Sequence, residues 1–109
     1  MNVHQTQFAR LFVRLLAMAI PCAAFGDDAP AIFKSKCAPC HAADGSGNTP
    51  MGKKIGAKAL GSPEVQKQSD ADLQKIITSG KGKMPSFSNK LSSEQIGGMV
   101  KFIRSFAAK

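Results

Sequence analysis

The sequence predicts an all-α protein, with three to four short helices. Apolar residues recur at helical spacing in two segments, 70–79 and 93–107, and each segment follows a serine that can cap a helix. The stretches between the predicted helices are rich in Gly, Pro, Ser and Lys, which is typical of loops. We find no alternation of strands with helices, so an α/β fold is disfavoured.

The first 26 residues have the pattern of a secretory signal peptide. Arg10 and Arg14 precede an apolar run, 15–25, and small residues end the segment at Gly26. A spanning helix needs about 20 apolar residues, so the run is too short for the alternative, an uncleaved membrane anchor. We expect cleavage after Gly26, export to the periplasm, and one domain over 27–109 with no stable membrane insertion.

The chain after the predicted leader is basic. It contains all seven acidic residues of the protein and all of its 15 basic residues except Arg10 and Arg14. An excess of lysine favours either solubility or electrostatic attraction to an acidic partner. Nucleic-acid binding is disfavoured, because the chain shows neither clustered arginines nor aromatic residues interleaved with basic ones.

The most specific motif is Cys37-Ala38-Pro39-Cys40-His41. This spacing is that of a c-type haem attachment site, in which both thiols form thioether bonds and the histidine becomes an axial iron ligand. Two other readings are open. A structural zinc site needs four ligands, and the usual second Cys/His pair is absent. A redox dithiol of the thioredoxin kind needs surrounding strands. We expect one covalent haem, with the short helices wrapped around it.

A first helix is predicted over 28–37. Asp27 or Asp28 can cap it, and Pro30 suits its first turn. Phe33 lies four residues before Cys37 and therefore on the same face of the helix. We expect Phe33 in the core beside the haem.

Residues 42–63 are predicted to be loops, followed by a short helical turn over 63–68. Ile55 and Leu60 are expected in a satellite core. A buried ligand histidine usually donates its second ring N–H to a backbone carbonyl. Pro50 is a candidate for that carbonyl, and an ordinary turn proline is the alternative.

A helix over 70–79 is predicted to begin at the Ser69/Asp72 capping pair and to end at Gly80, and to bury a stripe formed by Leu73, Ile76 and Ile77.

Met84 follows that helix in a Gly/Pro-rich loop, which is an unusual place for a core methionine. Its thioether is a soft ligand suited to haem iron, so we predict Met84 as the second axial ligand. Met51 and Met99 are the rivals. Met99 falls on the apolar stripe of the last helix and is expected in the core, whereas chain length alone does not exclude Met51.

The last helix is predicted over 93–107. Ser92 and Gln95 form a capping box. Its apolar residues recur at helical spacing and are expected to be buried: Ile96, Met99, Val100, Ile103 and Phe106.

With the leader, the Cys–His motif, the helices and the Met-Pro loop in this order, the chain resembles the small bacterial class I cytochromes c. The resemblance rests on Cys37-x-x-Cys40-His41, on the run 73–85 and on residues 100–104 of the last helix. It implies an all-α fold and His41 and Met84 as iron ligands, in preference to Met51.

The resemblance also implies that the first and last helices cross near Phe33 and Phe102. One departure concerns the haem propionates. Relatives often carry Tyr or Trp near the methionine loop or in the last helix, whereas this chain contains neither residue type. Hydrogen bonds to the propionates must therefore come from residues that the sequence does not identify.

A monomeric one-electron carrier between periplasmic redox proteins, without enzymatic activity, is the function expected from the sequence. One haem edge is then expected to be ringed by lysines, with candidates at Lys53, Lys54, Lys81 and Lys83. A haem enzyme or gas sensor with a labile methionine ligand is one alternative. A fixed subunit of a larger respiratory complex is the other.

Overall fold

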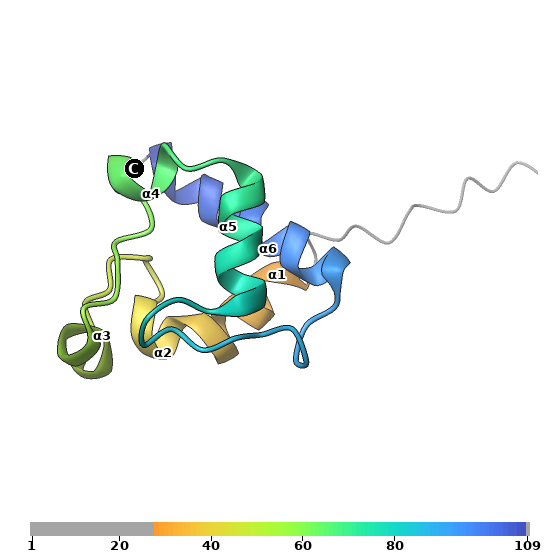
Figure 1. Cartoon of the computed structure of the whole chain (residues 1–109). Coiled ribbons are helices and arrows are strands. Elements are labelled where there is room, and N and C mark those ends of the chain that lie inside the picture. Colours follow the sequence, from red (N-terminus) through yellow and green to blue (C-terminus); the bar gives the residue numbers. More distant parts are fainter. Residues whose placement is uncertain (1–27, 109) are drawn as a thin grey trace, which may run out of the picture.

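The structure is a computed structural model that describes residues 28–108 (Figure 1). Within this part of the chain the regular elements are helices, and the β-type pairing there is a single isolated bridge between Lys81 and Met84. The predicted all-α class is confirmed. The predicted signal peptide, 1–26, and residue Asp27 lie outside the described residues.

The first helical stretch is longer than predicted and contains the whole Cys–His motif. It consists of α1 (Ala29–Ile32), the π-helical turn η3 (Phe33–Cys37) and α2 (Ala38–His41). A proline in the first turn of a helix has no amide hydrogen to leave unpaired, so Pro39 does not end the stretch. The predicted end at Cys37 was therefore wrong, and the Asp28 side chain makes no capping hydrogen bond.

A helix absent from the prediction, α3 (Pro50–Ile55), lies within the segment that was expected to be all loop. Thr49 caps its N-terminus by accepting a hydrogen bond from the Gly52 amide at 2.8 Å. Gly56 ends it in the left-handed conformation, at φ +71°. Gly52 is buried, and a Cβ on it would collide with the carbonyl oxygen of Cys40. Packing against α2 therefore stabilises a helix whose buried glycine is a poor helix former.

The remaining helices lie in the predicted segments, although the helices predicted over 63–68 and 93–107 end a few residues early. They are α4 (Pro63–Gln66), α5 (Asp70–Ser79) and α6 (Ser93–Arg104), followed by the 3₁₀ turn η4 (Ser105–Ala108). Both hydrogen bonds of the Ser92/Gln95 capping box are present. The Ser69 hydroxyl accepts from the Asp72 amide at the start of α5. No helix within residues 28–108 is long and apolar enough to cross a membrane.

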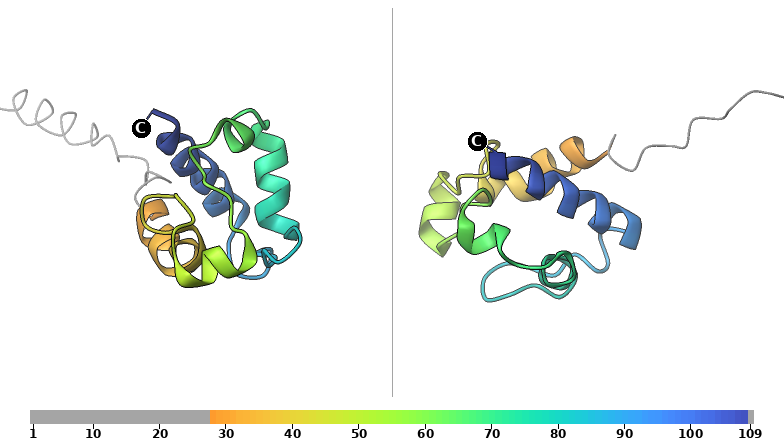
Figure 2. Two further views of the ribbon diagram at one scale, coloured as in Figure 1. Left: turned by 90° about the vertical axis from the view of Figure 1, so that its left-hand side faces the viewer. Right: turned by 90° about the horizontal axis from the view of Figure 1, so that it is seen from above.

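The helices surround the middle of the molecule rather than stacking in layers (Figures 1 and 2). The rings of Phe33 and Phe102 lie 5.0 Å apart between their centroids, so the implied contact between the first and last helices is confirmed. Met99 is 1% exposed and is the most deeply buried large side chain of the described residues. The buried apolar cluster consists of Phe33, Leu60, Val65, Leu73, Ile77, Phe87, Leu91, Ile96, Met99, Val100, Ile103 and Phe106.

Arg104 is the one arginine of residues 28–108, and it holds the connection between α4 and α5. Its guanidinium donates to the carbonyl oxygens of Gln66 (2.8 Å) and Gln68 (2.5 Å) and to Asp70 Oδ1 (2.9 Å). The rigid fork of arginine suits several acceptors at once, which a lysine ammonium does not match. This network fixes one side of the central space.

Candidate haem site

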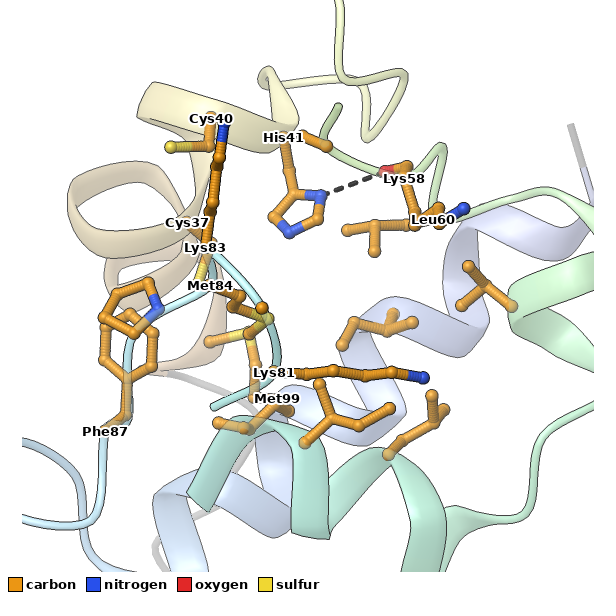
Figure 3. Close-up of a pocket in the computed structure, with 18 of the residues that line it drawn as sticks. Cys37, Cys40, His41, Lys58, Leu60, Lys81, Lys83, Met84, Phe87 and Met99 are labelled. Carbon is orange, nitrogen blue, oxygen red and sulfur yellow. Dashed lines mark hydrogen bonds between the residues drawn. The ribbon is translucent and has the colours of Figure 1, made fainter. Parts of the chain in front are cut away.

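A cavity of about 380 Å³ lies at the centre of the helices (Figure 3). Ligand sites of proteins occupy about 300–1,000 Å³, so the cavity has the size of a cofactor site. Four side chains predicted from the sequence line it: Cys37, Cys40, His41 and Met84. The fold therefore brings together two segments that are more than 40 residues apart in the chain.

The His41 ring is oriented by a backbone carbonyl. Its Nδ1 lies 3.0 Å from the carbonyl oxygen of Lys58, which is 17 residues further along the chain. A carbonyl oxygen can only accept, so Nδ1 carries the hydrogen and donates it. The lone pair of Nε2 is then available to a metal ion, and the ring points into the cavity (Figure 3).

The partner of His41 differs from the candidate named from the sequence. Pro50 is the first residue of α3, and it does not supply the carbonyl. A backbone carbonyl was correctly predicted as the partner of the His41 ring, but Pro50 was the wrong candidate for the residue that supplies it. A backbone carbonyl leaves no side-chain signal, so Lys58 could not be singled out before the fold was known.

Thr49 was also missed, and it fastens the Cys–His motif to α3. Its hydroxyl lies 2.9 Å from the carbonyl oxygen of Pro39 and 3.1 Å from that of Cys40, both of which are acceptors. The Gly47 amide donates to the carbonyl oxygen of His41 at 2.7 Å. The pattern Thr-Pro, a capping residue followed by proline at the first helical position, is the sequence signal that could have identified both α3 and Thr49.

The chain leaves α2 through a strained residue. Ala42, directly after His41, has φ +66° and ψ +158°. It is the one non-glycine residue with positive φ among residues 28–108. This region of backbone conformation is essentially restricted to glycine, and such strain concentrates at functional sites.

Cys37 and Cys40 are not joined by a disulfide, and both are partly buried. The pKa of the Cys37 thiol is raised from 9.0 to about 11, mainly because the thiol is buried. The nearby Lys36 ammonium lowers this pKa and Cys40 raises it, and both effects are smaller than that of burial. Redox dithiols depend on a lowered pKa, so the dithiol reading is disfavoured. The described residues contain no group of three or more His, Cys, Asp or Glu side chains that could hold a metal ion, which disfavours the zinc reading.

The three methionine candidates occupy different environments. Met84 is half-buried and lines the cavity. Met51 is 51% exposed on α3 and is not part of the cavity wall. Met99 lines the cavity from α6, within the core as predicted. Of the two methionines in contact with the cavity, Met84 is the one on a loop and Met99 the one fixed inside a helix.

The Met84 loop is held by short-range bonds. The amides and carbonyls of Lys81 and Met84 pair at 3.1 Å and 3.0 Å across a tight turn. The Ser86 hydroxyl donates to the carbonyl oxygen of Thr78 at 2.6 Å. Gly80 has φ +78°, and a Cβ there would lie 2.7 Å from the carbonyl oxygen of Met84. The loop therefore lies directly against the C-terminal end of α5.

Lysines line the rim of the cavity, but not all of the expected ones. Lys81 and Lys83 line it, together with Lys36 and Lys58. The other expected residues, Lys53 and Lys54, are exposed on α3 and lie outside the cavity wall.

The residues present fit a haem. The wall of the cavity is largely apolar, and it includes Phe33, Leu60 and Ile77. An imidazole nitrogen and a thioether sulfur both reach the cavity, and two thiols line it at the spacing used for thioether attachment. The chemistry of this donor set is that of an iron porphyrin rather than of an isolated metal ion.

Comparisons with known proteins agree with this donor set. A family model described as cytochrome c oxidase, cbb3-type, subunit III matches residues 24–103. Cytochrome c6 of Bryopsis maxima is 35% identical over 77 residues, covering 66% of this chain and 81% of the relative. Cytochrome c6 of Rippkaea orientalis is 33% identical over 98 residues, covering 85% and 83%.

Among solved structures, the KustC0563 c-type cytochrome superposes on this chain with a TM-score of 0.67 at 31% identity. The match covers 72% of this chain and 96% of that structure. The family model, the relatives and the similar solved structure are thus all cytochromes of the kind that the Cys–His motif predicts. The chain belongs to the small class I c-type cytochromes, a family of electron carriers that use haem c.

Proposed function

We propose that the protein carries single electrons between periplasmic redox partners on one covalently bound haem. The observation that carries this proposal is that Cys37, Cys40, His41 and Met84 line the same cavity. In the proposed site the two cysteines would attach the haem, and His41 and Met84 would hold its iron. The haem, when bound, supplies a ferrous/ferric couple.

The surrounding residues support a carrier rather than a catalyst. The Lys58 carbonyl holds the His41 ring in one orientation, which limits rearrangement during electron transfer. A thioether at the second axial position raises the reduction potential relative to a second histidine. With His41 and Met84 both bound to the iron, no coordination site would be left for a substrate.

The proposal includes export and a single domain. Residues 1–26 are proposed as a cleaved signal peptide and 27–109 as the mature, monomeric cytochrome. Thioether attachment of haem takes place on exported chains, so the leader and the Cys–His motif support each other.

The proposed partners are redox proteins with acidic docking surfaces. Lys36, Lys58, Lys81 and Lys83 place positive charge at the rim of the cavity. Attraction between exposed charges is screened over about 8–10 Å at physiological salt. We therefore expect association to slow as salt is raised. Association rates that stay constant across a wide range of salt would remove the electrostatic part of the proposal.

A second candidate function is a fixed subunit of a respiratory complex, and the description of the matching family model favours it. The haem chemistry is the same in both cases. Gel filtration of a native extract distinguishes them, because a diffusible carrier elutes at the size of the monomer and a subunit elutes with its complex.

Spectroscopy of protein produced with haem-maturation machinery tests the proposal. We expect a c-type spectrum that survives acid–acetone extraction, no titratable thiols, and the near-infrared band of a methionine–iron bond. Protein that stays colourless, with both thiols free, would contradict the proposal. A high-spin spectrum with ready binding of carbon monoxide would instead favour an enzyme or gas sensor.

A further inference from the structure

The haem of the proposed site carries two propionate groups, whose partners the sequence leaves unassigned. In a haem, the two vinyl groups and the two propionates lie at opposite edges of the ring. Attachment of the vinyl groups to Cys37 and Cys40 therefore directs the propionates to the side of the cavity away from these cysteines. Ionised carboxylates in a largely apolar cavity are costly unless they are paired or hydrogen-bonded.

Lys81 extends toward that side. In Figure 3 its side chain runs across the cavity, away from the cysteines, and its amine ends on the side where Lys58 and Leu60 lie. Lys83 lies on the cysteine side in the same view. Lys81 thus combines an aliphatic stem along the apolar wall with a cationic end at the proposed propionate edge.

The other donors near this edge are already engaged. The Lys58 ammonium pairs with Glu64 at 3.1 Å. The Gln68 side chain donates to the carbonyl oxygen of Glu64 at 3.4 Å. Arg104 does not line the cavity, and its guanidinium is held by the α4–α5 connection. Within residues 28–108 the Lys81 ammonium forms no ion pair with a carboxylate of the chain.

We propose that Lys81 binds a haem propionate. The assignment rests on the proposed haem site. It gives the chain, which lacks Trp and Tyr, a charge-assisted partner for the propionate edge. A nearby ammonium favours the ionised carboxylate and so lowers its pKa.

The test is the pH dependence of the midpoint potential of the holoprotein, with haem methyl NMR shifts as a second readout of the propionate pKa. Glu64, Lys58 and His41 also face the cavity, so the same titration is run on Glu64→Gln to identify the Glu64 transition. For Lys81→Gln we expect the propionate pKa to rise by about 1 unit, because an opposite charge is removed.

Lys83→Gln is the matched control, since it removes an equal charge from the same loop on the cysteine side. If the propionate pKa shifts equally in both variants, the effect is one of net charge and the assignment is overturned. An unchanged propionate pKa in Lys81→Gln also overturns it. If the parent carries no haem, the proposed function itself fails. A parent with the methionine–iron band and an unshifted Lys81→Gln variant refutes this inference alone.

Discussion

The two walls of the cavity that carry His41 and Met84 are held in different ways. The His41 wall is fixed by the Lys58 carbonyl, by Thr49 and by the Gly47 amide, so it depends on chain segments brought back by the fold. The Met84 wall rests on its own turn and on the adjoining end of α5. Contacts that are few and local open at lower free energy than the rest of a fold.

The two proposed ligands should therefore respond differently to perturbation. Loosening the methionine loop should cost the methionine–iron bond and leave the histidine wall intact. Loosening the histidine wall should affect the stability of the whole domain.

Met84→Ala removes the thioether itself. We expect complete loss of the near-infrared methionine–iron band, a lower reduction potential and binding of carbon monoxide to the ferrous form. Absorption and near-infrared spectroscopy measure this. Met51→Ala is the control, because the Met51 side chain is exposed outside the cavity wall and its removal should change none of these properties. Retention of the band in Met84→Ala would assign the ligand to another residue, with Met99 as the next candidate.

Gly80→Ala displaces the methionine loop while keeping its sulfur. At φ +78° an alanine is strained, and its Cβ would press on the Met84 carbonyl. The two effects together are expected to destabilise the loop by about 3 kcal/mol. We expect the methionine–iron band to disappear at a lower urea concentration than helix content does. Gly56→Ala, also at positive φ but in open space, separates strain from collision.

Thr49→Val breaks the histidine wall. The change removes the cap of α3 and leaves the Pro39 and Cys40 carbonyls without the hydroxyl, at a cost of about 2 kcal/mol. Global urea unfolding followed by circular dichroism measures the loss. Thr49→Ser keeps the hydroxyl and should recover most of the stability. If Thr49→Val loses the methionine band before helix content, the two walls are coupled and the contrast between them is wrong.

Ala42→Gly has the smallest effect, and it is stabilising. Glycine relieves the strained backbone conformation after His41, and its greater freedom in the unfolded chain offsets part of that gain. We expect a net increase of about 1 kcal/mol in the free energy of unfolding. The absorption spectrum should be unchanged. A destabilised Ala42→Gly variant would mean that the alanine methyl contributes packing that outweighs the strain.

Local signals predicted much of this molecule. The limits of α5 and the start of α6 followed from Ser69, Gly80 and the Ser92/Gln95 pair, because capping depends on neighbouring residues alone. The Cys–His motif is local in the same sense. These features could be predicted because the residues that determine them are adjacent in the sequence.

The features that could not be predicted depend on tertiary contacts. The Thr49-Pro50 start of α3 is a local signal that was overlooked, whereas the close packing of Gly52 on the Cys40 carbonyl is visible only in the fold. Lys58 was missed because its main chain, not its side chain, contacts His41. The sequence also could not show that Lys81 and Lys83 lie on different sides of the cavity.

The main-chain nature of the contact between Lys58 and His41 separates two kinds of evolutionary change. Any amino acid at position 58 presents the same oxygen to the imidazole, so this contact places no constraint on the identity of the residue there. Insertions and deletions between 41 and 58 move that oxygen relative to the ring and are therefore selected against. Across homologous genes, the number of residues in this interval should vary less than the identities of those residues.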